Sequence, residues 1–88
     1  MSKWRYKNLL RDDPETPGID CGDHFSVHDA AEEAASYEHD VRDGWEGQWP
    51  MTFVLIDEDG SAYDVVVDRE SRPHFFVLSS ELRYAPQP

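Results

Sequence analysis

Apolar and polar side chains alternate along the first segment of the chain. Residues 4–10 place Trp4 and Tyr6 on one side and Arg5 and Lys7 on the other, which predicts a half-buried strand. Residues 12–18 contain two prolines and a glycine among acids and predict a loop. The segment from Ile19 to Val27 is ambiguous, although its last three residues alternate and suit a short strand returning beside the first.

The second half of the chain predicts three consecutive strands joined by two turns. Residues 51–57 and 74–79 form the outer strands, and a turn over residues 57–61 precedes the middle one. A type I turn with a bulge at Gly60 gives a register with two distinct faces. The face toward the core then carries Met51, Phe53, Leu55, Tyr63, Val65 and Val67. The face toward water carries Thr52, Val54, Ile56, Ala62, Asp64, Val66 and Asp68.

A two-residue turn would shift this register by one and exchange the two faces. The bulged turn is preferred because it leaves the aspartates of the middle strand in solvent. Three successive strands with short turns form an antiparallel meander.

One alanine-rich segment has the period of a helix. Two caps fit its start, namely Ser26 followed by Asp29, and Asp29 followed by Glu32. Asp43-Gly44 predicts its end, because glycine favours the left-handed conformation after a helix. The expected apolar face comprises Val27, Ala30, Ala34, Tyr37 and Val41.

These elements predict an α+β fold in which one helix packs on an antiparallel sheet of four to five strands. The order is β-(β)-α-β-β-β, with the second strand in doubt, and the architecture is a two-layer sandwich. The 88 residues are expected to form a single domain, residues 1–88.

The net charge of the chain and its distribution limit the classes of partner. The chain has 19 Asp and Glu against 8 Lys and Arg, a net charge of −11. Residues 1–11 hold four bases and no acid, whereas residues 12–46 hold twelve acids and one base, Arg42. This charge argues against direct binding of nucleic acid or anionic lipid. No apolar run predicts a membrane span or a signal peptide, and a single cysteine, Cys21, favours the reducing cytoplasm.

The acidity gathers on one side of the expected helix. At about 100° per residue, five carboxylates fall within an arc of about 100° with only Ser36 among them. These are Asp29, Glu32, Glu33, Asp40 and Asp43. Such a stripe has two explanations: a solvated face that maintains solubility, or a binding surface for a basic protein that normally holds nucleic acid.

Motifs for chemistry are weak. Cys21, His24 and His28 are zinc-type ligands, but no second pair completes a site, so no metal or other cofactor is expected. Residues 57–60 resemble the opening of a calcium loop with its glycine misplaced, and a hairpin turn is favoured. No phosphate loop, nucleophile elbow or HExxH motif is present. We therefore expect no enzymatic activity.

Two segments are similar to small acidic proteins of bacteriophages and prophages, including anti-CRISPR proteins. These segments are DAAEEAA and GWEGQWPMTFVLIDEDGSAYDVVVDRE, within residues 25–79. The resemblance implies an inhibitor that occupies the nucleic-acid channel or the PAM-reading surface of a Cas complex. Because anti-CRISPR proteins share no common motif, it transfers no functional residue.

The leading hypothesis is a non-enzymatic inhibitor that binds a basic protein surface, such as that of a Cas effector, in the bacterial cytoplasm. The expected contacts are the five carboxylates of the stripe, with Trp45 and Trp49 as aromatic anchors. The alternative is a small structural or accessory module that forms a homodimer. Its interface would be the sheet face that carries Val54, Ile56 and Val66, which is unusually apolar for an exposed face.

Overall fold

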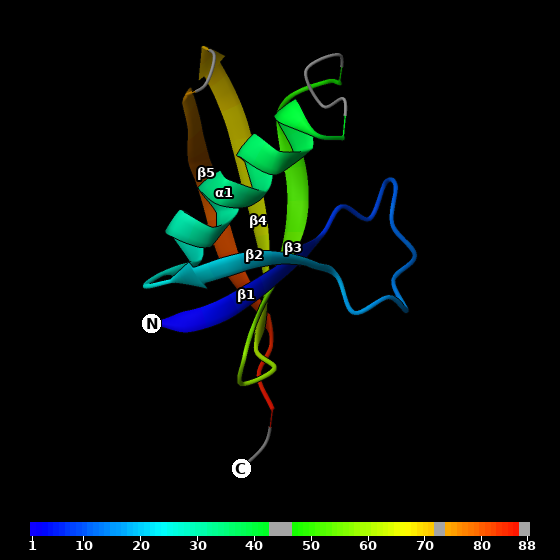
Figure 1. Ribbon diagram of the computed structural model, residues 1–88, viewed down its shortest axis with the longest axis vertical. Helices are drawn as coiled ribbons and strands as arrows, with labels where there is room; N and C mark the ends of the chain where they lie inside the picture. The colour runs from blue at the N-terminus through cyan, green and yellow to red at the C-terminus, as the bar shows by residue number, and fades with distance from the viewer. Residues whose placement is uncertain (43–46, 72–73, 87–88) are drawn as a thin grey trace.

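The computed structural model describes residues 1–42, 47–71 and 74–86. In chain order the elements are β1 (Ser2–Lys7), β2 (Ile19–His24), α1 (Val27–Asp40), β3 (Met51–Asp57), β4 (Ala62–Ser71) and β5 (His74–Tyr84). The strands form one sheet in the order β2-β1-β3-β4-β5, with every neighbouring pair antiparallel. The helix lies across one face of this sheet (Figure 1). The predicted two-layer α+β fold, with its meander of β3, β4 and β5, is confirmed.

The core lies between the helix and the inner face of the sheet. Each central strand contributes alternate side chains to it, as the period of two requires. The helix contributes alanines, whose small side chains allow close packing on the strands. The buried apolar side chains of this core are Trp4, Tyr6, Cys21, Ala30, Ala31, Ala34, Ala35, Phe53, Leu55, Val65 and Val67.

The hairpin of β3 and β4 has the predicted register. Phe53 pairs with Val65 and Leu55 with Tyr63. The amide of Gly60 donates to the carbonyl oxygen of Asp57 at 3.0 Å, and Gly60 has φ +91°, as a bulged type I turn requires. The same turn makes residues 57–60 a hairpin rather than a calcium loop.

The outer face of the sheet departs from the prediction at one position. Val54 was expected in water but is only 6% exposed. Leu9, Leu10, Pro50 and Val54 line one hollow on this side of the sheet. Ile56 and Val66 are half-buried.

The helix begins where one of the two predicted caps places it. The side chain of Ser26 accepts a hydrogen bond from the amide of Asp29 at 3.2 Å, so Ser26 is the N-cap. The helix ends at Asp40, and Val41 caps it by donating its amide to the Tyr37 carbonyl at 2.8 Å. The end is therefore earlier than predicted, and Asp43-Gly44 lies outside the described residues.

The buried side of α1 is rotated relative to the prediction. Its buried residues are Ala30, Ala31, Ala34, Ala35, Glu38 and His39. Tyr37 and Val41, expected in the core, are 38% and 60% exposed. At about 100° per residue this is a rotation of roughly 70°. The prediction of the face was wrong because it counted apolar residues only, whereas the fold buries a glutamate and a histidine.

Several strand boundaries also differ from the prediction. β1 is Ser2–Lys7 rather than residues 4–10, because the chain turns after Asn8. The strand beside β1 is Ile19–His24 and not the segment of Phe25 to Val27, because Ser26 caps the helix and Phe25 is exposed. β5 continues from His74 to Tyr84, five residues beyond the predicted end, because it pairs with β4 along its whole length. Among the described residues, no helix is long and apolar enough to cross a membrane.

Candidate partner-binding surface

Four of the five predicted carboxylates lie on the exposed side of α1. Asp29, Glu32, Glu33 and Asp40 are all exposed, and we call them the acidic face of α1. The observed burial centres on the opposite side of the helix, about 180° from Asp29. The rotation of the helix therefore turns the acidic face more directly toward solvent than the predicted packing did.

The side chains of this face have few partners in the molecule. Within the described residues, no hydrogen bond or ion pair engages the carboxylate of Asp29, Glu32 or Glu33. Asp40 differs, because its Oδ1 lies 2.7 Å from Nδ1 of His39. Three adjacent carboxylates are thus available to a partner without breaking any contact.

These three carboxylates border an open hollow of about 630 Å³ between α1 and the sheet. Its lining residues are His24, Asp29, Glu32, Glu33, Ser36, His74 and Phe75. Phe75 is half-buried and lines the hollow beside the carboxylates. Asp40 does not reach the hollow, since it lies seven residues beyond Glu33, about 10 Å along the helix.

Trp49, one of the two predicted aromatic anchors, does not line the hollow beside this face. Trp49 packs against the edge of the core, with its ring centroid 5.3 Å from that of Phe75. The guanidinium carbon of Arg69 lies 5.8 Å from the Trp49 ring centroid, a cation–π contact. Trp45 and Asp43 lie outside the described residues. Trp49 contacts Phe75, which lines the hollow.

A second carboxylate of α1 lies on the buried side and was missed from the sequence. Glu38 is fully buried, and Tyr6 Oη donates to its Oε2 at 2.5 Å. Asn8 Nδ2 donates to Oε1 at 3.1 Å, and Arg42 Nη1 donates to Oε2 at 3.2 Å. The Nη1 of Arg11 lies 3.5 Å from Oε1. Two cations and two neutral donors therefore satisfy the buried charge, as buried carboxylates require.

Arg42 connects Glu38 to the loop after β1. It forms a bidentate pair with Asp12, with Nη2–Oδ1 at 2.5 Å and Nη1–Oδ2 at 3.1 Å. This pair holds the pKa of the Asp12 carboxyl below its usual range. Burial and the bond to Glu38 raise the pKa of Tyr6, which therefore remains a neutral donor. We call Tyr6, Asn8, Arg11, Asp12, Glu38 and Arg42 the Glu38 cluster.

The cluster anchors the helix and offers no site for a substrate. Tyr6 is 1% exposed and Glu38 is fully enclosed, so a ligand has no access to the buried carboxylate. The burial of Glu38 could have been inferred from its position in the sequence. Nine residues at about 100° place Glu38 opposite Asp29, among the helix alanines, and Arg42 follows it at the i+4 position.

The candidate zinc ligands do not converge. The Nε2 of His24 lies 2.7 Å from the carbonyl oxygen of Cys21, and that of His28 lies 3.4 Å from Ser80 Oγ. Burial raises the pKa of the Cys21 thiol to about 12, with contributions from the charges of Asp20 and Glu33. A thiol with that pKa is a poor nucleophile at neutral pH. In the described part of the chain, no group of three His, Cys, Asp or Glu side chains is arranged to hold a metal ion.

The described surface therefore offers an acidic helix face beside a hollow as its candidate for binding a partner. In the comparisons with known proteins, no family model, no curated protein and no solved structure matches the chain.

Proposed function

We propose that the protein is a non-enzymatic, phage-type inhibitor that acts in the bacterial cytoplasm. Its acidic face of α1 would bind the basic groove of a nucleic-acid-binding protein, such as a Cas effector, and block access of DNA. The observation that carries this proposal is a set of three exposed carboxylates on one helix that have no hydrogen bond or ion pair among the described residues: Asp29, Glu32 and Glu33.

The charge density of this face supports the proposal. Asp29 and Asp40 are eleven residues apart, about 16 Å along the helix axis. Over that length the face carries four negative charges, and one DNA strand carries about five at ~3.4 Å per phosphate. A groove built of Lys and Arg for a DNA strand would therefore meet a similar number of charges on this helix.

The hollow beside the face adds a means of recognition. A Lys or Arg side chain in it would place its charge against Glu32 and Glu33 and its aliphatic stem near Phe75. Carboxylates bind guanidinium groups with two parallel hydrogen bonds, and aromatic rings attract cations. The proposed partner therefore presents Arg or Lys side chains from its DNA-binding groove.

The experiment reverses the charge of the face and leaves the rest of the molecule unchanged. The test variant is Asp29→Lys/Glu32→Lys/Glu33→Lys. The control variant is Glu15→Lys/Glu70→Lys/Glu81→Lys, which changes the same number of exposed acids away from the helix. Each protein is titrated into purified, guide-loaded Cas effectors, and binding of target DNA is measured at several salt concentrations.

We expect the natural protein to compete with DNA and the control variant to retain most of that competition. The test variant should lose more than about tenfold in potency, equivalent to ~1.4 kcal/mol. Inhibition should weaken as salt rises from about 50 to about 300 mM, because charge-dominated binding is screened. Equal loss in both variants, or inhibition indifferent to salt, would show that the acidic face is not the binding surface. The absence of competition with every effector would overturn the proposed class of partner.

A further inference from the structure

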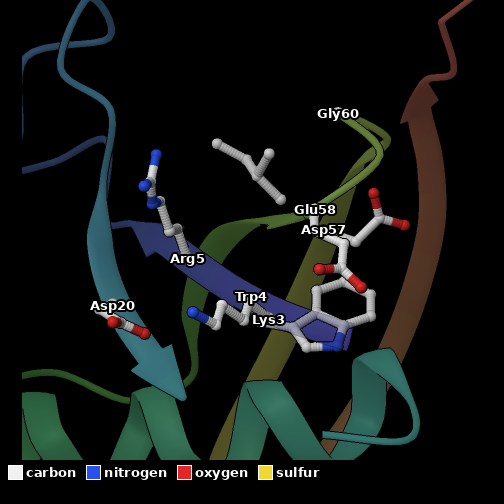
Figure 2. Close-up of a pocket in the computed structure, with 8 residues that line it drawn as sticks. Lys3, Trp4, Arg5, Asp20, Asp57, Glu58 and Gly60 are labelled. Carbon is white, nitrogen blue, oxygen red and sulfur yellow. The ribbon is translucent and has the colours of Figure 1, made fainter. Parts of the chain in front are cut away.

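A third hollow, of about 430 Å³, lies between β1 and the turn that joins β3 to β4. Figure 2 shows its arrangement, with Lys3 and Arg5 rising from β1 and Asp57 and Glu58 on the turn opposite. Ile56 is also part of the lining. Lys3 and Arg5 thus form one wall, with Asp20 of β2 beside them, and the carboxylates of Asp57 and Glu58 form the other.

The charges of the two walls are not neutralised within the molecule. Among the described residues, no ion pair or hydrogen bond engages the side chains of Lys3, Arg5 or Glu58. Asp57 uses its Oδ1 to accept from the amides of Asp59 and Ser61 in its own turn. Asp20, opposite Arg5 on β2, accepts from the amide of Gly22. Asp20 and Asp57 therefore remain anionic, because backbone amides do not neutralise a carboxylate. Within the described residues, the wall side chains without a hydrogen bond or ion pair are Lys3, Arg5 and Glu58.

The surface between the walls is apolar. Ile56 lies between Arg5 and Ala62 in the sheet, since it pairs with Arg5 on β1 and with Ala62 on β4. Ala62 pairs in turn with Tyr84 on β5, which is 59% exposed. This row crosses the face of the sheet that α1 does not cover. An apolar strip flanked by charged residues is the usual anatomy of a protein interface.

The geometry points to a second copy of this chain as the occupant of this surface, in a two-fold symmetric dimer. A two-fold interface requires that each patch be complementary to itself, so that residue i meets j and j meets i. Here Lys3 and Arg5 of each copy would meet Glu58 of the other copy, so that the same contact forms two times. Ile56 would lie near the two-fold axis. Ile56 and Tyr84 would supply the apolar contact.

The distribution of charge along the chain favours the cationic side of this hollow as a point of contact. Two copies with a net charge of −11 each repel one another. Four of the eight bases lie in the first eleven residues, and two of them, Lys3 and Arg5, line this hollow. The outer side of β1 is thus where two copies can approach with least repulsion.

The dimer would leave the acidic face of α1 free. The helix covers one face of the sheet (Figure 1), and the interface would use the other. Two acidic faces would then point outward on opposite sides of the dimer. This inference does not depend on the proposed function, because either surface can operate without the other.

The first measurement is the mass of the full chain in solution by sedimentation equilibrium over a wide range of concentration. We expect the mass to rise from 10.2 kDa toward twice that value. A mass that remains at the monomer throughout overturns the inference. A mass that continues to grow beyond the dimer also overturns it, because it would indicate head-to-tail contact of acidic and basic surfaces.

The second measurement identifies the contact by exchange of charge. Arg5→Glu alone and Glu58→Lys alone should each weaken the dimer by more than about tenfold, since symmetry creates two like-charge pairs in each. An equimolar mixture of the two variants should form a heterodimer. In it, the new Glu at position 5 of one variant meets the new Lys at position 58 of the other, and the second contact remains the natural pair of Arg5 with Glu58. Glu70→Lys, an exposed charge reversal at the opposite end of β4 from Ala62, is the matched control and should dimerise normally.

A mixture that remains monomeric would overturn the assigned contact even if the natural chain dimerises. Circular dichroism confirms that each exposed variant is folded, and Ile56→Lys tests the apolar centre independently. In the DNA competition assay, Arg5→Glu should still inhibit. Failure of the dimer and failure of the acidic face are therefore observed in separate experiments.

Discussion

The two sides of α1 carry the same chemical group in opposite circumstances. On the exposed side, the carboxylates of Asp29, Glu32 and Glu33 form no hydrogen bond or ion pair with any described residue. On the buried side, Glu38 is enclosed and has four neighbours that donate to it or neutralise it. The residues are within ten positions of one another, so local sequence does not explain the difference.

The buried carboxylate of α1 matters for stability, whereas the exposed carboxylates are free for binding. An exposed carboxylate retains its hydration and contributes little to the free energy of unfolding. A buried carboxylate has lost its hydration, and its charge is tolerated only while its partners remain in place. The Glu38 cluster should therefore determine whether α1 stays attached to the sheet, and the acidic face should be free to vary or to bind.

The largest effect on stability is expected from Glu38→Ala. The change leaves Tyr6 Oη and Asn8 Nδ2 buried without an acceptor and Arg42 without one of its partners. We expect the free energy of unfolding to fall by about 3–5 kcal/mol, measured by urea denaturation. Glu33→Ala on the opposite side is the control and should change it by less than about 0.5 kcal/mol. Similar small losses in both variants would contradict the comparison.

The next effect concerns Asp12, whose pKa is lowered by Arg42. A lowered pKa stabilises the fold above the ordinary Asp value of about 3.9, and this stabilisation is lost as the pH falls through the folded-state pKa. Asp12→Asn should therefore be less stable than the natural protein by about 1–3 kcal/mol at neutral pH. The difference in the free energy of unfolding between the two proteins should become smaller below about pH 4. Urea denaturation at a series of pH values measures this difference. A difference that does not change with pH would refute the role of the Asp12 charge.

A smaller effect is expected at the start of the helix. Ser26→Ala removes the acceptor of the Asp29 amide and should cost about 1 kcal/mol. Ser26→Asp should retain most of the stability, because aspartate is an equally good N-cap. Thermal denaturation of the three proteins tests both expectations. An unchanged Ser26→Ala variant would mean that Asp29 can serve as the cap instead.

The smallest effect is expected within the acidic face itself. Glu33→Gln removes a like-charge neighbour of Asp29 at the i+4 position. It should raise stability by a few tenths of a kcal/mol at low salt. The gain should disappear near about 1 M salt, where the screening length is ~3 Å. Paired thermal melts at the two salt concentrations measure it, and a loss of stability would show that Glu33 has a structural partner.

Much of the fold could be predicted from the chain, because it rests on local regularities. The alternation of Trp4 with Arg5 and the pattern around Gly60 predicted β1 and the register of the β3–β4 hairpin, both of which are confirmed. The presence of the helix could be predicted from the sequence, but not which of its sides packs on the sheet. Its apolar residues suggested burial of Tyr37 and Val41, and the structure buries Glu38 and His39 instead.

The candidate surface could be predicted only in part. The exposure of Asp29, Glu32, Glu33 and Asp40 follows from their helical period, and the structure agrees with it. Their hollow could not be foreseen, because His74 and Phe75 come from a strand more than thirty residues away. Trp49 lies in the core edge rather than beside the stripe, since a loop tryptophan has no periodicity from which its direction can be read.

By itself, the sequence determined the types and order of the elements, the register of the hairpin and the concentration of charge on one helix. These follow from periods of two and 3.6 residues, which depend on neighbours along the chain. Only the tertiary structure decided which side of α1 faces the sheet, because Glu38 is made tolerable by Tyr6 and Asn8, thirty or more residues away. It also placed the cations of β1 opposite Glu58, since the pairing of β1 with β3 joins distant segments. Burial of a charge depends on partners that the fold supplies, and no local pattern records them.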